Sequence, residues 1–147
     1  MKVHEYRCEL WLSAAKDRVF SFFADAANLD AITPPWLNFE ILTPMPLALH
    51  KGALIDYRLR VRGVPFRWKT RINKWSPPDV FVDEQIQGPY RLWIHEHTFQ
   101  ARDTGTLVRD HVRYATPLDT LLHRWVVRPD IERIFNYRAA VLTKLLV

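Results

Sequence analysis

Apolar and polar residues alternate along the first segment of the chain, from Val3 to Leu12. The apolar positions that share one side are Tyr6, Cys8, Leu10 and Leu12. Charged residues occupy most of the other side, where Trp11 is the exception. A period of two is typical of a strand with one buried face, so the chain is expected to begin with a strand over 3–12.

Two short helices are expected after this strand. Ser13 can serve as the N-cap of a helix over 14–25, whose apolar stripe is formed by Val19, Phe20, Phe22 and Phe23. A second short helix is expected over 26–32, because Pro34 and Pro35 cannot continue it.

Six further strands are predicted in the middle of the chain, where short runs of β-branched and aromatic residues alternate with turn-forming residues. Their expected ranges are 36–43, 53–61, 66–75, 80–86, 90–101 and 106–115. The connections between the last five are three or four residues long. Connections this short join only antiparallel neighbours.

From Leu118 onward the apolar residues recur with the period of a helix that continues almost to the end of the chain. Its apolar positions are Leu121, Leu122, Trp125, Val126, Ile134, Phe135, Val141, Leu142, Leu145 and Leu146. Pro129 either kinks this helix or begins a second part of it, with the proline in the first turn.

This order of elements predicts an α+β fold with a single domain over 1–147. We expect a curved, seven-stranded antiparallel sheet wrapped around the long C-terminal helix, with the two short helices between the first and second strands. One helix cannot fill the concave face of a strongly curved sheet. A cavity is therefore expected between the sheet and the helix.

Composition narrows the classes of function. The formal net charge is +5, but charged residues make up an ordinary 25% of the chain and form no long run, so no nucleic-acid partner is expected. Cys8 is the only cysteine, which suits a reducing compartment. The start MKVHEYRCEL is not an apolar signal segment, and no apolar run could span a membrane. We therefore expect a cytoplasmic protein.

The order of elements and five local segments resemble the SRPBCC superfamily of helix-grip proteins, and locally its bacterial polyketide cyclase/dehydrase-like branch. The superfamily includes START lipid-transfer domains, birch-pollen-allergen-like proteins and aromatic polyketide cyclases. The segments are ITPPWLNF (32–39), FVDEQIQGPY (81–90), WIHEHTF (93–99), GTLVRD (105–110) and RIFNYR (133–138). The resemblance covers nearly the whole chain. It implies a pocket for an apolar ligand but no particular reaction, since members share a pocket and not a chemistry.

Pairing arithmetic assigns residues to the inner face of the predicted sheet. If Ala101 pairs with Thr106, the opposed pairs that share a face are Phe99 with Val108, His97 with Asp110, His95 with Val112 and Trp93 with Tyr114. This face is mostly apolar and is therefore the inner one. A bulge at Gly105 would shift the register by one residue.

The same arithmetic across Arg62 and Gly63 separates an aromatic face from a basic one. The inner residues are Tyr57, Leu59, Phe66, Trp68 and Ile72. The outer residues, called the basic sheet face below, are Arg58, Arg60, Arg67, Lys69 and Arg71. This face is either a solvated surface that deters edge-to-edge pairing or a dock for anionic lipid headgroups or an acidic partner.

The aromatic residues exceed what a dense core of this size usually employs, and six of them are tryptophans. We therefore predict a binding wall for a flat or long apolar molecule. The predicted wall consists of Trp36, Tyr57, Phe66, Trp68, Trp93, His95, His97, Phe99, Asp110, Tyr114, Trp125 and Phe135.

His95 and His97 supply the most suggestive chemistry. Residues two apart on a strand point the same way, about 7 Å apart at the backbone, so with Asp110 they could present ligands to one metal ion. No third ligand follows at a fixed interval, and the resembled superfamily requires no metal. The chain also lacks a phosphate-binding glycine loop. We expect neither a metal nor another cofactor.

His97 and Asp110 can instead form an acid–base pair, in which the carboxylate holds the histidine in one tautomer and raises its basicity. The resemblance to cyclases and dehydrases permits this role. The alternative is a buried polar pair that orients a ligand. Asp83 or Glu84 could add a second carboxylate, because the turn at 87–89 leaves open which of the two faces inward.

Three hypotheses follow. The first is a non-catalytic binder of a small hydrophobic molecule such as a lipid, a quinone or a polyketide-like ring, and the sequence favours it. The second is a cofactor-independent cyclase or dehydratase of the lyase type that uses His97 and Asp110. The third is an interaction module that docks on an acidic partner or a membrane surface through the basic sheet face.

Overall fold

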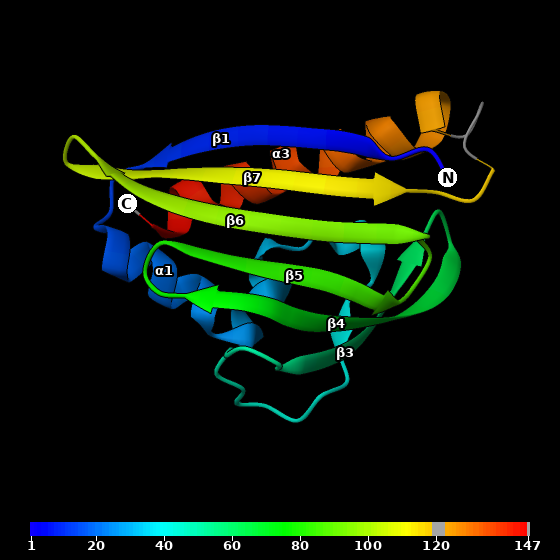
Figure 1. The fold of residues 1–147 in the computed structure, drawn as a ribbon, viewed down its shortest axis with the longest axis horizontal. Coiled ribbons are helices and arrows are strands. Elements are labelled where there is room, and N and C mark those ends of the chain that lie inside the picture. The colour runs from blue at the N-terminus through cyan, green and yellow to red at the C-terminus, as the bar shows by residue number, and fades with distance from the viewer. Residues whose placement is uncertain (119–122, 147) are drawn as a thin grey trace.

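The computed structural model describes residues 1–118 and 123–146, and its largest feature is one antiparallel sheet of seven strands (Figure 1). The order across the sheet is β1-β7-β6-β5-β4-β3-β2. The strands are β1 (His4–Leu12), β2 (Glu40–Ile41), β3 (Leu54–Val61), β4 (Val64–Ser76), β5 (Val80–Gln87), β6 (Leu92–Arg102) and β7 (Gly105–Ala115). The predicted α+β fold and antiparallel sheet are confirmed.

The helical segments of the described residues lie behind the sheet in the view of Figure 1, where α3 runs behind β1 and β7. They are α1 (Lys16–Ala24), the 3-10 segments η1 (Ala26–Ile32) and η2 (Pro35–Leu37), the π-helical segment η3 (His123–Val127) and α3 (Arg128–Leu145). The predicted grip of the sheet on the C-terminal helix is confirmed. No helix of the described residues is long and apolar enough to cross a membrane.

Pro129 lies in the first turn of α3, which confirms the predicted restart of the helix at this proline. The part predicted around Leu121 and Leu122 lies outside the described residues. The helix predicted at 26–32 is present as the 3-10 helix η1, and the Asp25 side chain caps it by accepting from the Ala27 amide at 3.1 Å.

The predicted N-cap of the first helix is wrong. Helix α1 begins at Lys16 after Ala15, and no side chain caps it. The reason lies in the sheet, where the buried Thr106 hydroxyl donates to the Ala14 carbonyl at 2.7 Å. This bond fits a chain that stays close to the start of β7 beyond Ser13, so that the helix starts two residues later than predicted.

The strand predicted over 36–43 is mostly absent. Pro35 begins the 3-10 turn η2, which ends at Asn38 in the left-handed conformation (φ 47°). Asparagine tolerates this conformation better than most residues. Only the two residues of β2 pair with β3, where Glu40 opposes Arg58 and Ile41 opposes Tyr57.

Both predicted hairpin registers are confirmed. Across the β6–β7 turn, His97 opposes Asp110 and Trp93 opposes Tyr114, with no bulge at Gly105. Across the β3–β4 turn, Tyr57 opposes Trp68. These registers place the predicted inner residues on the face that looks toward α3.

The apolar core is largest at one end of the molecule. There, Phe20 and Phe23 of α1 pack against Phe81 and Phe99 of the sheet, and Leu142 near the end of α3 joins them. Phe20 and Phe99 meet edge to face with ring centroids 5.1 Å apart. The other half of the molecule holds two smaller apolar clusters. This uneven packing leaves room between the sheet and the first turns of α3.

Candidate functional site

A cavity of about 600 Å³ lies between the inner face of the sheet, η1, η2 and α3. Much of its wall is aromatic: the Trp68 ring stacks on Tyr57 at 5.9 Å and meets Trp93 edge to face at 5.6 Å. The predicted wall residues that line it are Trp36, Tyr57, Phe66, Trp68, Trp93, His95, His97 and Phe135.

Four residues of the predicted wall lie elsewhere. Phe99 faces the same side as the cavity, but Phe20 and Phe23 of α1 cover it. Tyr114 is fully buried, and its hydroxyl bonds with His123 Nε2 at 2.6 Å. Asp110 lies beside the histidines and does not line the cavity.

Trp125 is the fourth of these residues, and it corrects the predicted phase of the C-terminal helix. Its side chain is 65% exposed, and the Arg124 guanidinium lies 5.2 Å from its ring. The segment around it is a π-helix, whose wider turn alters the helical phase assumed in the prediction. Val126 and Val127 line the cavity in its place.

The lining residues that reach solvent mark the mouth of the cavity. They are Trp36, Arg62, Pro117, Leu118 and Arg133. A two-pronged ion pair spans this mouth, since Arg62 at the β3–β4 turn donates to both oxygens of Asp130 in the first turn of α3, at 3.1 and 2.9 Å. The pair links the β3–β4 hairpin to α3, which forms the opposite wall of the cavity.

A buried polar cluster forms one part of the cavity wall. His95 Nε2 lies 2.7 Å from Asp110 Oδ1, and His97 Nε2 lies 2.6 Å from Asp83 Oδ2. His97 Nδ1 lies a further 3.3 Å from Asp110 Oδ1. Asp83 thus faces inward, which answers the choice between Asp83 and Glu84. The predicted His97–Asp110 pair is brought together, but within a larger cluster.

Arg138 completes this cluster and was not among the predicted site residues. Its Nη2 lies 3.5 Å from Asp110 Oδ1, and its guanidinium lies 5.1 Å from the Phe23 ring. Arg138 ends the RIFNYR segment quoted above for the resemblance. Apolar periodicity gives no weight to a charged residue on an inward helix face, so the pattern did not find it.

The two histidines have opposite protonation preferences. Burial and the nearby His97 lower the pKa of His95 to about 4. Burial also disfavours charge on His97, but its bonds to Asp110 and Asp83 outweigh this and raise its pKa. Their rings stack with centroids 3.6 Å apart, so two positive charges at this spacing would repel each other strongly.

Both carboxylates of the cluster stay ionised. Burial opposes their charge, yet His97 lowers the pKa of Asp83, and Arg138 together with the two histidines holds the pKa of Asp110 well below its usual value. Near neutral pH the cluster therefore contains two carboxylates, one guanidinium, one imidazolium at His97 and a neutral His95. These charges balance, which is what burial requires.

The neutral His95 has one nitrogen with an open lone pair. Its Nε2–H donates to Asp110 in this arrangement, so Nδ1 carries no proton. His95 lines the cavity, and Nδ1 lies 3.9 Å from Asp83 Oδ2, beyond hydrogen-bond distance. The cluster thus contains a proton acceptor in His95 and a proton donor in His97.

Asp83, His95 and His97 offer ligand atoms within 4.8 Å of one another and are the candidate metal ligands of the described residues. An imidazole nitrogen binds a metal in the plane of its ring, yet these rings stack at an interplanar angle of 25°. His97 Nε2 also makes a direct 2.6 Å hydrogen bond to the third candidate ligand. In this arrangement the side chains are joined by hydrogen bonds, and at least one imidazole ring must rotate before the cluster can bind a metal ion.

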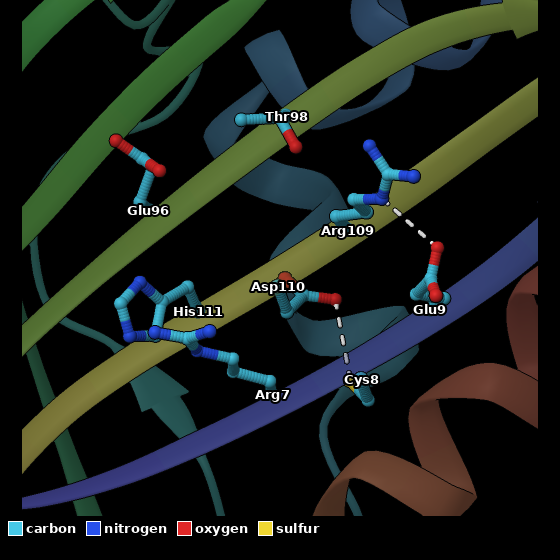
Figure 2. A pocket seen from close by; sticks show the side chains of 8 residues that line it. All are labelled: Arg7, Cys8, Glu9, Glu96, Thr98, Arg109, Asp110 and His111. Atoms are coloured by element: carbon cyan, nitrogen blue, oxygen red, sulfur yellow. Dashed lines mark hydrogen bonds and ion pairs between the residues drawn. The ribbon is translucent and has the colours of Figure 1, made fainter.

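A second depression, of about 400 Å³, lies over the outer side of β1, β7 and β6 (Figure 2). Several of its charged groups pair with each other or with neighbours, as when Arg109 Nε donates to Glu9 at 2.9 Å. Cys8 Sγ donates to Asp110 at 3.8 Å, and burial with this carboxylate raises the pKa of the thiol to about 12. A thiol with that pKa is a poor nucleophile, so the inner cavity is the better candidate site.

Comparison with known proteins agrees with this geometry. Residues 12–140 match the model of the family described as polyketide cyclase / dehydrase and lipid transport. The chain belongs to this family. Membership in the polyketide cyclase / dehydrase and lipid transport family is consistent with a hydrophobic ligand in the cavity. No curated protein matches the chain in sequence.

Several solved structures resemble the fold over nearly its whole length. Protein Ms6760 from Mycobacterium smegmatis is similar with a TM-score of 0.71 and 16% identity, over 99% of this chain and 96% of that chain. Ginseng major latex-like protein 151 from Panax ginseng has a TM-score of 0.73 and 10% identity, over 99% and 98%. A protein from Thermus thermophilus, TTHA0849, has a TM-score of 0.66 and 19% identity, over 97% and 99%. At these identities the likeness shows the fold alone.

The opposite preferences of the two histidines can be measured by NMR titration of ¹⁵N-labelled imidazoles. His97 is expected to keep its proton above pH 6.5, since its pKa is raised, and His95 to stay neutral until the pH falls to about 4. Joint titration of both buried rings near pH 6.5, or the reverse order, contradicts the charge pattern described above.

Proposed function

We propose that this protein binds a small, mostly apolar molecule that carries several oxygen acceptors, within the cavity between the sheet and α3. The aromatic wall supports the apolar part of this proposal, because rings bury a large area with few degrees of freedom. The volume of about 600 Å³ suits a ligand of several fused rings or a folded chain.

One observation supports the proposal that the ligand carries oxygen acceptors. Trp68 Nε1, Thr116 Oγ1 and Arg138 Nε are the buried side-chain nitrogen and oxygen atoms of the described residues that have no hydrogen-bond partner. All three residues line the cavity. An indole N–H and a guanidinium N–H can only donate, so their partners must be acceptors. Each unpaired buried group costs about 1–3 kcal/mol, which a ligand oxygen would offset.

The placement of these donors favours an oxygenated ring system over a fatty acyl chain. Trp68 lies on β4, Thr116 directly follows β7 and Arg138 lies on α3, so the three groups come from different walls. A fatty acid has oxygen at one end only. A quinone or a polyketide-like ring has oxygens at several edges and fits three separated donors better.

A matched pair of ligands tests this proposal. Anthraquinone and anthracene differ by two carbonyl oxygens, and each can be titrated by displacement of a fluorescent anilinonaphthalene sulfonate. We expect anthraquinone to bind at least tenfold more tightly. Trp68→Phe should weaken anthraquinone binding about tenfold more than anthracene binding, because both ligands lose the same apolar contact but only anthraquinone loses a buried hydrogen bond.

Trp75→Phe is the control, since Trp75 packs against Phe20 and Phe81 outside the cavity. It should leave both affinities within twofold. Equal affinities for the two ligands, or an equal loss of both in Trp68→Phe, would sink the proposal.

A cofactor-independent cyclase or dehydratase is the second candidate function, and the opposite protonation of the two histidines favours it. Loss of water from a β-hydroxyketone needs a base for the α-proton and an acid for the leaving hydroxyl. The neutral His95 suits the first role and the protonated His97 the second, with Asp110 as the group that orients both.

Dehydration of 4-hydroxy-4-phenylbutan-2-one to the conjugated enone tests the second candidate by ultraviolet absorbance. An enzyme of this kind accelerates the reaction over buffer and loses at least about a hundredfold in rate on His97→Gln, while ligand affinity stays within a few-fold. Absence of any acceleration by the unmodified protein argues against this chemistry and leaves binding as the function.

A further inference from the structure

Five segments lie at the end of the sheet where the cavity opens, and their surface has a distinct composition. They are 1–3, 62–64, 86–91, 116–118 and 123–127, and together they are called the mouth end here. Strand pairing and side-chain contacts hold them together: His4 opposes Tyr114, Val61 opposes Val64, and His123 stacks on His4 at 3.4 Å. In Figure 1 the mouth end lies on the right.

Large apolar side chains on the mouth end are open to solvent. Leu118 is 79% exposed, Trp125 65% and Val64 54%, and Val3 and Ile86 are exposed as well. They come from five separate segments at this end of the molecule. Exposed apolar groups gathered around one opening mark an interaction site more often than isolated ones do.

Positive charge is interleaved with these apolar groups. The mouth end contains Lys2, Arg62, Arg91 and Arg124, and its five segments contain no Asp or Glu. Arg62 is paired with Asp130 of α3, whereas Lys2, Arg91 and Arg124 are exposed and form no ion pair with another described residue. Turns at the other end carry the acidic residues Asp79 and Asp103.

We propose that the mouth end docks on an anionic lipid bilayer, with Trp125 and Leu118 inserted at the interface. Tryptophan favours the boundary between headgroups and acyl chains, and each cation near an anionic surface adds to the attraction. Leu118, Val126 and Arg62 also line the cavity, so the docked mouth opens directly toward the bilayer. An apolar ligand then moves between membrane and cavity without crossing water.

The basic sheet face is a weaker candidate for the same partner. Arg58 there is bound to Glu40 at 2.6 Å, and Lys69 lies 3.9 Å from Asp56. Its cations are therefore partly neutralised, and it carries no tryptophan. The two surfaces can be separated by variants that change charge equally.

Vesicle co-sedimentation tests the docking surface. The protein should bind vesicles of 70% phosphatidylcholine and 30% phosphatidylglycerol at least tenfold more tightly than pure phosphatidylcholine, and lose this preference in high salt. Lys2→Glu with Arg91→Glu should weaken binding at least tenfold, as should Trp125→Ala. Arg67→Glu with Arg71→Glu applies the same charge change to the basic sheet face and should change binding less than twofold.

The docking surface is wrong if the protein ignores anionic vesicles, binds neutral vesicles equally well, or loses as much affinity in the basic-sheet-face variant. A soluble acidic partner would give the first of these results. The inference rests on the proposed ligand, so anthraquinone binding is measured in solution on the Lys2→Glu, Arg91→Glu variant. Unchanged anthraquinone binding with failed docking removes only the membrane inference, whereas failed anthraquinone binding in the unmodified protein removes the proposed function.

Discussion

Asp110 on β7 is a buried carboxylate, and the polar part of the cavity is arranged around it. A carboxylate removed from water is costly unless it is paired and hydrogen-bonded. Here its Oδ1 atom contacts the side chains of His95 and His97 on the neighbouring strand and of Arg138 on α3. The same contacts hold the helix against the sheet, give the two histidines different protonation states and orient the groups that face a ligand. Binding and any proton transfer thus depend on one charge-balanced cluster.

The position of the cavity follows from where α1 packs. Phe20 and Phe23 of this short helix cover Phe81 and Phe99, so one end of the curved sheet has a filled core. The helix does not extend over Trp68 and Trp93, which instead line the open half. Aromatic residues on the same sheet face therefore fill the core where α1 covers them and line the cavity where it does not. The Arg62–Asp130 pair spans the mouth of the open half.

Strand registers were the most predictable part of the site. Short hairpin turns determine which residues oppose each other, so His95, His97 and Asp110 could be placed on the inner face from the sequence. Asp83 could not, because the turn at 87–89 leaves open which of Asp83 and Glu84 faces inward. The β4–β5 pairing does not help, since it contains register shifts on either side of 70–72 that no turn residue announces. Trp125 depends on helix phase, which the π-helical turn at 123–127 changes, whereas Arg138 was missed because apolar periodicity does not mark a charged residue on an inward helix face. Phe99 shows a different limit, since its face was right but the packing of the first helix over it was not foreseen.

Native mass spectrometry of the protein purified from its own host, followed by extraction and accurate mass determination of what is bound, tests the ligand class most directly. One bound molecule per chain is expected, with a carbon-rich formula that contains several oxygens and the unsaturation of fused rings. A bound saturated acyl chain with a single carboxylate, or a chain that carries no small molecule when isolated from the host, would contradict the assignment of an oxygenated ring to the donors of Trp68, Thr116 and Arg138.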